Sequence, residues 1–241
     1  MSNVSISTNK LTIGYGSTVI QRNLTFSLNA GEMVCMLGPN GCGKSTLLRT
    51  LAGLQPALSG DYTHSDAKNI ALVLTERLSM DNTTVHDVVA LGRYPYSSFL
   101  DGLKAEDENI IEDSLRQVGF ADTSVSKTFF NAHSDGEKQR ILIAKALAQQ
   151  TPIILLDEPT AHLDLPHRIL ILRLLRTLAH EQGKTILIST HELDLALALS
   201  DRILLMTPDH GIQLDTAENL KKADAFTAAF SMDIFHPLGV Q

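Results

Sequence analysis

The segment that decides the fold reads Gly38-Pro39-Asn40-Gly41-Cys42-Gly43-Lys44-Ser45 and fits the pattern G-x-x-x-x-G-K-[ST] at every fixed position. The apolar run 33–37 before it suits a buried strand, and the run 46–52 after it has helical spacing. A glycine-rich loop in this setting lets backbone N–H groups surround a phosphate, assisted by the positive end of the helix dipole. Lys44 would reach the β- and γ-phosphates, and the Ser45 hydroxyl would bind Mg²⁺. We therefore predict a nucleotide-binding site over the residues from Gly38 to Thr46.

Composition narrows the class of protein. The chain has 241 residues and a formal net charge of -7, which favours one domain with an inserted subdomain. We find no basic stripe, and this argues against nucleic acid as a partner. No signal pattern or membrane-spanning run is evident, so we expect a soluble, unexported chain. Cys35 and Cys42 are poorly placed for a disulfide or a metal cage, and they fit a reducing cytoplasm best.

Hydrophobic periodicity divides the chain into two kinds of region. Apolar and polar residues alternate at 4–10 and 24–28, as in half-exposed antiparallel strands, and the aliphatic run 70–74 suits a buried strand. Helical spacing dominates from about 84 to 150, and strand signals return at Ile153. We therefore predict an α/β core over 1–75 and 151–241 with a helical insertion over 76–150. Tyr15 lies between glycines, where turn packing and a ligand platform are both open roles.

Two carboxylates follow the apolar run 153–156. Asp157 and Glu158 thereby emerge at the carboxyl end of a buried parallel strand, where α/β folds place their ligand chemistry. Asp157 is suited to hold Mg²⁺ through water, and Glu158 to orient an attacking water. The alternative is that the two acids only start a loop or cap a helix, and the nearby phosphate loop makes that alternative weaker.

A further histidine follows the next strand. A helix predicted from Pro166 to Gln182 stops at Gly183, and the buried strand 185–189 ends in Thr190-His191. His191 could simply close a turn. Its position at the end of a strand, in line with Glu158, favours a contact to the γ-phosphate.

In this order the pieces resemble the nucleotide-binding subunit of an ATP-binding cassette (ABC) transporter over nearly the whole chain. The segment His133-Ser134-Asp135-Gly136-Glu137 is similar to the family's signature Leu-Ser-Gly-Gly-Gln, and Lys138-Gln139-Arg140 continues it as in the family. The resemblance implies that Tyr15 stacks on adenine and that His191 is the switch histidine. It also implies that the loop 161–164, which ends in Asp164, crosses a dimer interface.

The resemblance implies a fold and a mechanism as well. The fold is a phosphate-loop α/β core of the ABC type with an antiparallel β subdomain and the helical insertion, all in one domain over 1–241. Two copies would meet head to tail, with ATP and Mg²⁺ between them. Each ATP would be held by the phosphate loop of one copy and by the signature of the other, through Ser134, Asp135, Gly136 and Glu137. Hydrolysis would then open the dimer.

Three positions depart from the family pattern. His133 replaces a leucine, a mild loss of apolar packing. Asp135 replaces a glycine, and its carboxylate should point away from the triphosphate because like charges repel. The family usually has a glutamine after the strand 70–74 that touches Mg²⁺ and the attacking water. Thr75 stands at that position here, and either its hydroxyl or the neighbouring Glu76 could face the metal.

The chain is similar to cassette subunits of importers for large chelates: ferric siderophores, haem or cobalamin. The segment 91–96 resembles a Gly-Arg-x-Pro segment near the groove for the permease's coupling helix, although Arg93 and the tyrosines beside it could be ordinary loop anchors. The implied partners are integral membrane permease subunits contacting 76–100, a second copy of the chain and, indirectly, a periplasmic or surface solute-binding protein. The implied location is peripheral, on the cytoplasmic face of the inner (cell) membrane.

Two other functions remain open. One is a cassette ATPase that works with a soluble partner and no permease. The other is a module that clamps ATP but hydrolyses it poorly, suggested by Thr75 and Asp135. A small-molecule kinase is disfavoured, because it would not explain the signature segment or the loop at Asp164.

Overall fold

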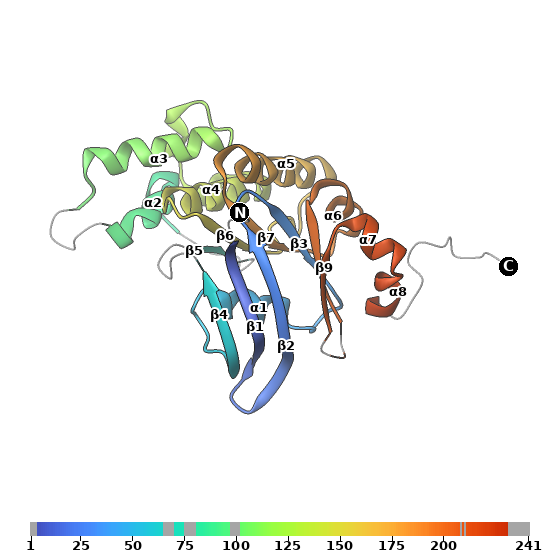
Figure 1. Ribbon diagram of the computed structural model, residues 1–241. Helices are drawn as coiled ribbons and strands as arrows, with labels where there is room; N and C mark the ends of the chain where they lie inside the picture. Colours follow the sequence, from blue (N-terminus) through green and yellow to red (C-terminus); the bar gives the residue numbers. More distant parts are fainter. Residues whose placement is uncertain are drawn as a thin grey trace.

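The computed structural model describes residues 4–64, 70–74, 81–96, 102–207, 209 and 211–230. Two sheets form its centre (Figure 1). A three-stranded antiparallel sheet has the order β2-β1-β4, and a six-stranded sheet has the order β5-β6-β7-β3-β8-β9. The strands are β1 Val4–Tyr15, β2 Thr18–Asn29, β3 Met33–Leu37, β4 Ser59–His64, β5 Ile70–Val73, β6 Ile153–Asp157, β7 Thr185–Ser189, β8 Arg202–Met206 and β9 Ile212–Asp215.

The six-stranded sheet is parallel apart from β9, which pairs antiparallel with β8. Every residue of β3, β6 and β7 is buried, and their sequences are nearly continuous apolar runs. Such runs are expected where both faces of a sheet are covered. The parallel register brings the carboxyl ends of these strands to one edge of the sheet, and this edge carries the predicted site.

The two faces of this sheet belong to two separate cores. Val34 and Met36 of β3 pack with the antiparallel sheet and with α1 (Lys44–Leu51). Met33, Cys35 and Leu37 face the opposite core, which contains α5 (Leu165–Gln182), α6 (Leu193–Leu199), α7 (Ala217–Lys222) and α8 (Ala225–Phe230). Because side chains alternate between the two faces of a strand, β3 contributes to both cores, and the six-stranded sheet lies between them.

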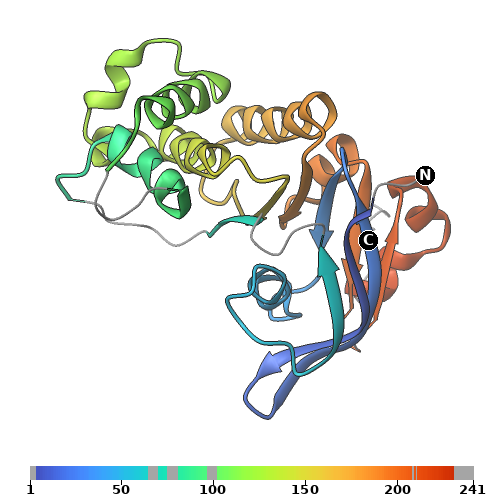
Figure 2. The same cartoon turned by 60° about the vertical axis from the view of Figure 1, so that its left-hand side comes forward.

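All described elements between β5 and β6 are helical and lie together to one side of the sheet (Figures 1 and 2). They are α2 Val85–Ala90, η1 Leu91–Tyr96, α3 Ala105–Gln117, η2 Thr123–Lys127, η3 Phe130–Ala132 and α4 Asp135–Ala148, where η marks a short 3-10 helix. Their apolar residues, including Val88, Ile111 and Ile141, continue the core of the helical face. Within the described residues, no helix combines the length and the apolar composition that crossing a membrane requires.

The antiparallel sheet differs from the sequence prediction in extent. β1 and β2 run to Tyr15 and from Thr18, well beyond the predicted segments, so Tyr15 ends a strand where a loop was expected. Lys10 and Asn23 adopt positive φ angles beside register shifts, which break the alternation that marks a strand. β4 was not predicted at all, because its sequence SGDYTH is mostly polar and becomes a strand only by pairing with β1.

Candidate nucleotide-binding site

The phosphate loop leaves β3 at Leu37 and enters α1 at Lys44. Gly38 has a φ of 155°, and a Cβ there would lie 2.6 Å from the Met206 carbonyl oxygen. Gly43 precedes the helix with a φ of 102°. These backbone conformations and the close approach of β8 explain the glycines, since larger residues adopt positive φ only with strain.

The Lys44 side chain folds back over this loop. Its ammonium donates hydrogen bonds to the carbonyl oxygens of Gly38 (2.8 Å) and Pro39 (3.2 Å). The residue is 6% exposed, so its charge sits inside the loop. An ammonium held there by neutral acceptors is available to phosphate oxygens, which are stronger, charged acceptors.

Sequence reasoning missed Gln21, which supports the loop from β2. Its Nε2 donates to the carbonyl oxygens of Cys42 (2.9 Å) and Thr207 (2.8 Å), and the residue is buried. Gln21 thereby ties the phosphate loop to the residue that follows β8. A polar residue in an alternating strand normally reads as solvent-facing, so the sequence carried no signal for this contact.

Tyr15 lies next to the helical end of the phosphate loop. Its hydroxyl is 3.2 Å from Thr46 Oγ1, and half of the residue is exposed. The structure thus brings the predicted adenine platform to the predicted phosphate site, with the side chain open to solvent. Stacking on a base stays a prediction.

Asp157 and Glu158 meet β7 at the same edge of the sheet. Asp157 pairs with Ser189, which in turn pairs with Met36, so the three strands end in register. Ser189 Oγ donates to Asp157 Oδ1 at 2.5 Å and accepts from the Glu158 backbone N–H at 2.9 Å. Ser189 was predicted only as a strand residue, but it positions both acids.

Glu158 and His191 are in direct contact. His191 Nε2 lies 2.5 Å from Glu158 Oε1, and the two side chains are 43% and 33% exposed. Glu158 adopts a φ of 46°, a left-handed conformation that is uncommon for this residue type and is often found at functional sites. The predicted catalytic pair is therefore assembled at a place that water can reach.

An Mg²⁺ site fits the residues at this edge. Ser45 in the first turn of α1 and Asp157 at the end of β6 offer hydroxyl and carboxylate oxygens, the ligands that Mg²⁺ prefers. The metal usually keeps several waters and also binds the nucleotide's phosphates, so few protein ligands are needed. The predicted third ligand, Thr75, lies outside the described residues, as does Glu76.

The signature segment caps helix α4. The Ser134 hydroxyl accepts from the Glu137 backbone N–H (3.4 Å), while the Ser134 backbone N–H and hydroxyl donate to Glu137 Oε2 at 3.0 and 2.8 Å. The bonds that the carboxylate accepts from the Ser134 backbone N–H and hydroxyl hold the pKa of the Glu137 carboxyl below its ordinary value. Gly136 is buried and Asp135 is exposed. The segment therefore presents a helix N-terminus, the usual place for an anion.

His133 makes packing contacts although it stands where the family has a leucine. Its ring meets the Phe120 ring edge-on at a centroid distance of 6.2 Å, and its Nε2 lies 2.7 Å from Thr128 Oγ1. The side chain is 11% exposed. The histidine therefore packs its ring against Phe120 and places a ring nitrogen at hydrogen-bonding distance from Thr128.

The loop ending in Asp164 turns into α5. Asp164 caps this helix, and its Oδ1 accepts from the backbone N–H of His167 at 3.2 Å and contacts His167 Nδ1. The side-chain and backbone hydrogen bonds from His167 lower the pKa of the Asp164 carboxyl. Arg168 holds the same loop through a 2.6 Å bond from its Nε to the Leu163 carbonyl oxygen.

The predicted permease region is described at residues 81–96. Arg93 is buried there, with its Nε 2.8 Å from Asp107 Oδ1 and its Nη1 2.8 Å from the Ala148 carbonyl oxygen. It is thus a loop anchor that joins η1, α3 and α4. Tyr94 and Tyr96 are 61% and 49% exposed and lie on the surface of this segment.

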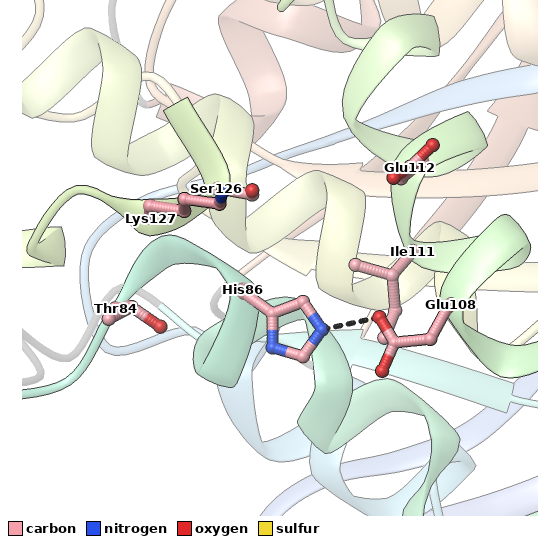
Figure 3. A pocket seen from close by; sticks show the side chains of 7 residues that line it. All are labelled: Thr84, His86, Glu108, Ile111, Glu112, Ser126 and Lys127. Atoms are coloured by element: carbon pink, nitrogen blue, oxygen red, sulfur yellow. Dashed lines mark hydrogen bonds and ion pairs between the residues drawn. The ribbon is translucent and has the colours of Figure 1, made fainter. Parts of the chain in front are cut away.

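Among the hollows in the described part of the chain, two lie beside these elements. One, of about 410 Å³, lies between α2, α3 and η2, and His86 Nε2 lies within hydrogen-bonding distance (2.7 Å) of Glu108 Oε2 at its wall (Figure 3). The other, of about 210 Å³, is lined by Leu37, Gly38, Thr190, His191, Leu193 and Phe230. The second hollow joins the start of the phosphate loop to the predicted switch histidine.

The fold and this edge of the sheet define a phosphate-loop ATPase, and the chain matches the family model for ABC transporters over residues 21–161. This is more than half of its length, so the chain belongs to the ABC transporter family. The predicted family, fold class and ATPase activity are thereby confirmed.

Particular relatives narrow the comparison. The chain is 40% identical to an uncharacterized ABC transporter ATP-binding protein of Methanocaldococcus jannaschii, covering 94% of this chain and 81% of that protein. It is 37% identical to the iron(3+)-hydroxamate import ATP-binding protein FhuC of Bacillus subtilis, covering 95% and 88%. A solved chain from an ABC transporter described as metal-chelate type, in an inward-facing conformation, superposes with a TM-score of 0.87 at 31% identity, covering 95% of this chain and 90% of that one.

Proposed function

We propose that the chain is the ATP-hydrolysing subunit of an importer for a ferric siderophore or a related metal chelate. It would act at the cytoplasmic face of the cell membrane with separate permease subunits. The observation that carries the catalytic part is the contact of Glu158 with His191 at the edge that also bears the phosphate loop. The cargo class rests on similarity to import proteins such as the iron(3+)-hydroxamate protein of Bacillus subtilis.

In this mechanism the phosphate loop binds ATP, and Glu158 and His191 at the carboxyl end of the sheet act on the attacking water and the γ-phosphate. Lys44 shifts its hydrogen bonds from the carbonyl oxygens of Gly38 and Pro39 to the β- and γ-phosphates. Ser45 and Asp157 would hold Mg²⁺, which would supply charge neutralisation for the phosphates. Glu158 orients a water and accepts its proton, and His191, in contact with that carboxylate, is placed to reach the γ-phosphate.

A second copy completes the site. Ser134 and Gly136 stand at the N-terminus of the 14-residue helix α4, whose dipole favours a phosphate. These residues would contact the ATP bound to the partner's phosphate loop. Because only the closed dimer contacts ATP from both sides, the nucleotide shifts the population between open and closed states and so drives the permease.

The region 76–100 is our proposed contact with the permease. Its described part offers two exposed tyrosines, Tyr94 and Tyr96, on a segment that Arg93 anchors firmly. Aromatic side chains on a rigid support are typical of interface centres. The hollow beside His86 lies within the same helical part of the chain (Figure 3).

The test is the ATPase rate of the purified chain over a series of protein concentrations, with Glu158→Gln in parallel. We expect the rate per subunit to rise with concentration. The variant should lose roughly 100-fold or more of the rate while still binding ATP, because an amide cannot accept the proton. Glu181→Gln, the same change at an exposed site on α5, is the matched control and should keep the parent rate. Normal turnover by Glu158→Gln would remove Glu158 from its role.

The cargo is tested separately in cells. Deleting the chain should abolish uptake of a radiolabelled ferric hydroxamate, and the parent chain should restore it where Lys44→Ala does not. A purified chain that brings down no integral membrane protein, from cells whose uptake is unaffected, would instead indicate a cassette ATPase with a soluble partner.

A further inference from the structure

One imidazole lies between two segments that the proposed dimer brings to the same interface. His167 sits in the first turn of α5, and its Nδ1 contacts Asp164 Oδ1 at the end of the interface loop. The Asp164 carboxylate already caps α5 through the His167 backbone N–H at 3.2 Å. The ring contact is therefore additional to the cap, and it fixes the orientation of the carboxylate.

The other edge of this ring meets the signature segment. A Cβ placed on Gly136 would lie 2.8 Å from His167 Cδ2 and 3.1 Å from His167 Cγ. The ring thus rests directly on the backbone of Gly136, and only glycine leaves room for that approach. Gly136 is buried, whereas the His167 side chain is 45% exposed, so the ring covers Gly136 from the solvent side.

The same turn of α5 holds the loop by a second route. Arg168 Nε donates to the Leu163 carbonyl oxygen at 2.6 Å, and its guanidinium pairs with Glu192, the residue after His191. The backbone of the loop is thereby tied toward the switch histidine, while its Asp164 carboxylate is tied toward the signature. Neither link is needed to form the helix itself.

From these contacts we infer that His167 is a positioning residue that sets the spacing between Asp164 and the signature Gly136. A planar ring with few rotatable bonds, in contact with both segments, couples a displacement of one segment to the other, because the ring cannot overlap the atoms that it touches. The inference rests on the proposed function, since the spacing matters for ATP hydrolysis only if both segments face a partner copy. In the dimer, Gly136, His167 and Asp164 would then contact the partner copy as one rigid unit.

Two variants separate the two halves of the contact. His167→Asn keeps an N–H near the position of Nδ1 but lacks the ring that packs on Gly136. His167→Phe keeps the ring but cannot donate to Asp164. His167→Ala removes both halves, and Leu170→Ala, at a residue that is 48% exposed on the same helix, is the matched control.

The first measurement is hydrogen exchange of the purified chain without nucleotide, followed in peptides covering 133–140 and 160–167. His167→Ala should speed exchange in both peptides, His167→Asn mainly in the signature peptide and His167→Phe mainly in the loop peptide. Leu170→Ala should change neither. Unchanged exchange at 133–140 in His167→Ala, or equal acceleration along all of α4 and α5, would overturn the inference and leave His167 an ordinary part of a helix start.

A double-mutant cycle in thermal unfolding checks the packing contact directly. Gly136→Ala should lower the melting temperature, and the loss should be smaller in the His167→Ala background, where the clashing ring is gone. Equal losses in both backgrounds would contradict the contact.

The second measurement is ATP-dependent dimerisation in the Glu158→Gln background, read by sedimentation. Adding His167→Ala should raise the ATP concentration for half-maximal dimer by roughly tenfold to a hundredfold, since small displacements of positioning groups have effects of that size. ATP binding to the monomer should stay unchanged. If the variants disturb exchange but dimerisation is normal, the inference fails and the proposed function stands. If Glu158→Gln alone never dimerises with ATP, the proposed dimer fails, and the exchange data still decide the link.

Discussion

Replacing Ser189 with alanine removes the hydroxyl that lies between Asp157 and Glu158 at the end of β6. Ser189 is fully buried, and its Oγ donates to Asp157 Oδ1 at 2.5 Å while accepting from the Glu158 backbone N–H at 2.9 Å. The Glu158 N–H keeps a second acceptor, the Ser189 carbonyl oxygen at 3.0 Å. The loss therefore falls mainly on Asp157, whose carboxylate becomes less well bonded in a nearly buried position.

The size of the effect follows from that one bond. A hydrogen bond to a charged group contributes about 1.5–3 kcal/mol to stability, so we expect Ser189→Ala to lower the free energy of unfolding by about 2 kcal/mol. For a domain of this size each kcal/mol corresponds to roughly 2–4 °C, which gives a melting temperature lower by about 4–8 °C. A less fixed Asp157 should also raise the Mg²⁺ concentration needed for half-maximal ATPase activity.

Scanning calorimetry and an Mg²⁺ titration of the ATPase rate measure the two effects. Ser7→Ala is the control, because the Ser7 hydroxyl bonds Thr63 on an exposed strand, where a loss should stay within about 0.5 kcal/mol. A melting temperature and an Mg²⁺ dependence both equal to those of the parent would refute the reasoning that Ser189 positions Asp157.

Three further outcomes are expected. Gln21→Leu leaves the carbonyl oxygens of Cys42 and Thr207 without their donor, but it also removes the buried Gln21 Oε1, which has no hydrogen-bond partner among the described residues. The net cost in unfolding free energy should be about 1–3 kcal/mol, and ATP binding should weaken; unchanged unfolding and binding curves would contradict this. Cys42 should react slowly with thiol reagents because burial raises its pKa, and more slowly still when Mg-ATP is bound. Cys35, whose pKa is raised to about 12, should not react. Equal labelling of Cys42 with and without nucleotide would count against its place in the loop. Because the pKa of the Glu137 carboxyl is lowered in the folded protein, its ionised form stabilises the fold above the ordinary pKa, and this stabilisation is lost as the pH falls through the lowered value. On acidification below about pH 5, the melting temperature of Glu137→Gln should therefore fall less than that of the parent. Equal decreases in the two proteins would argue against the helix cap.

Local chemistry let the sequence predict the elements that carry the site. The apolar runs of β3, β6 and β7, the glycines of the phosphate loop and the helix signals at Pro166 and Gly183 all lie within a few neighbouring residues. Gly183 does end α5 in a left-handed conformation with a φ of 67°. Such signals need no knowledge of the rest of the chain, because backbone conformation and burial pattern are written in contiguous residues.

The strand β4 and the bulged part of β1 could not be predicted, because they depend on pairing with residues far away in the sequence. The polar residues of β4 become a strand only because β1 offers it a hydrogen-bonding edge. The positive φ at Lys10 interrupts the two-residue period that identifies a strand. Where pairing and not burial determines the element, the hydrophobic pattern contains little information.

The sequence by itself therefore determined the phosphate loop, the acidic strand end and the histidine after the next strand, since each is encoded by residues next to one another. Only the tertiary structure decided that Ser189 holds Asp157, that Gln21 supports the loop at Cys42, and that His167 lies against Gly136. These contacts join residues far apart in the chain, and their directions depend on how sheets and helices pack. A polar side chain has the same chemistry in every environment, and its role depends on the partners that folding places within reach.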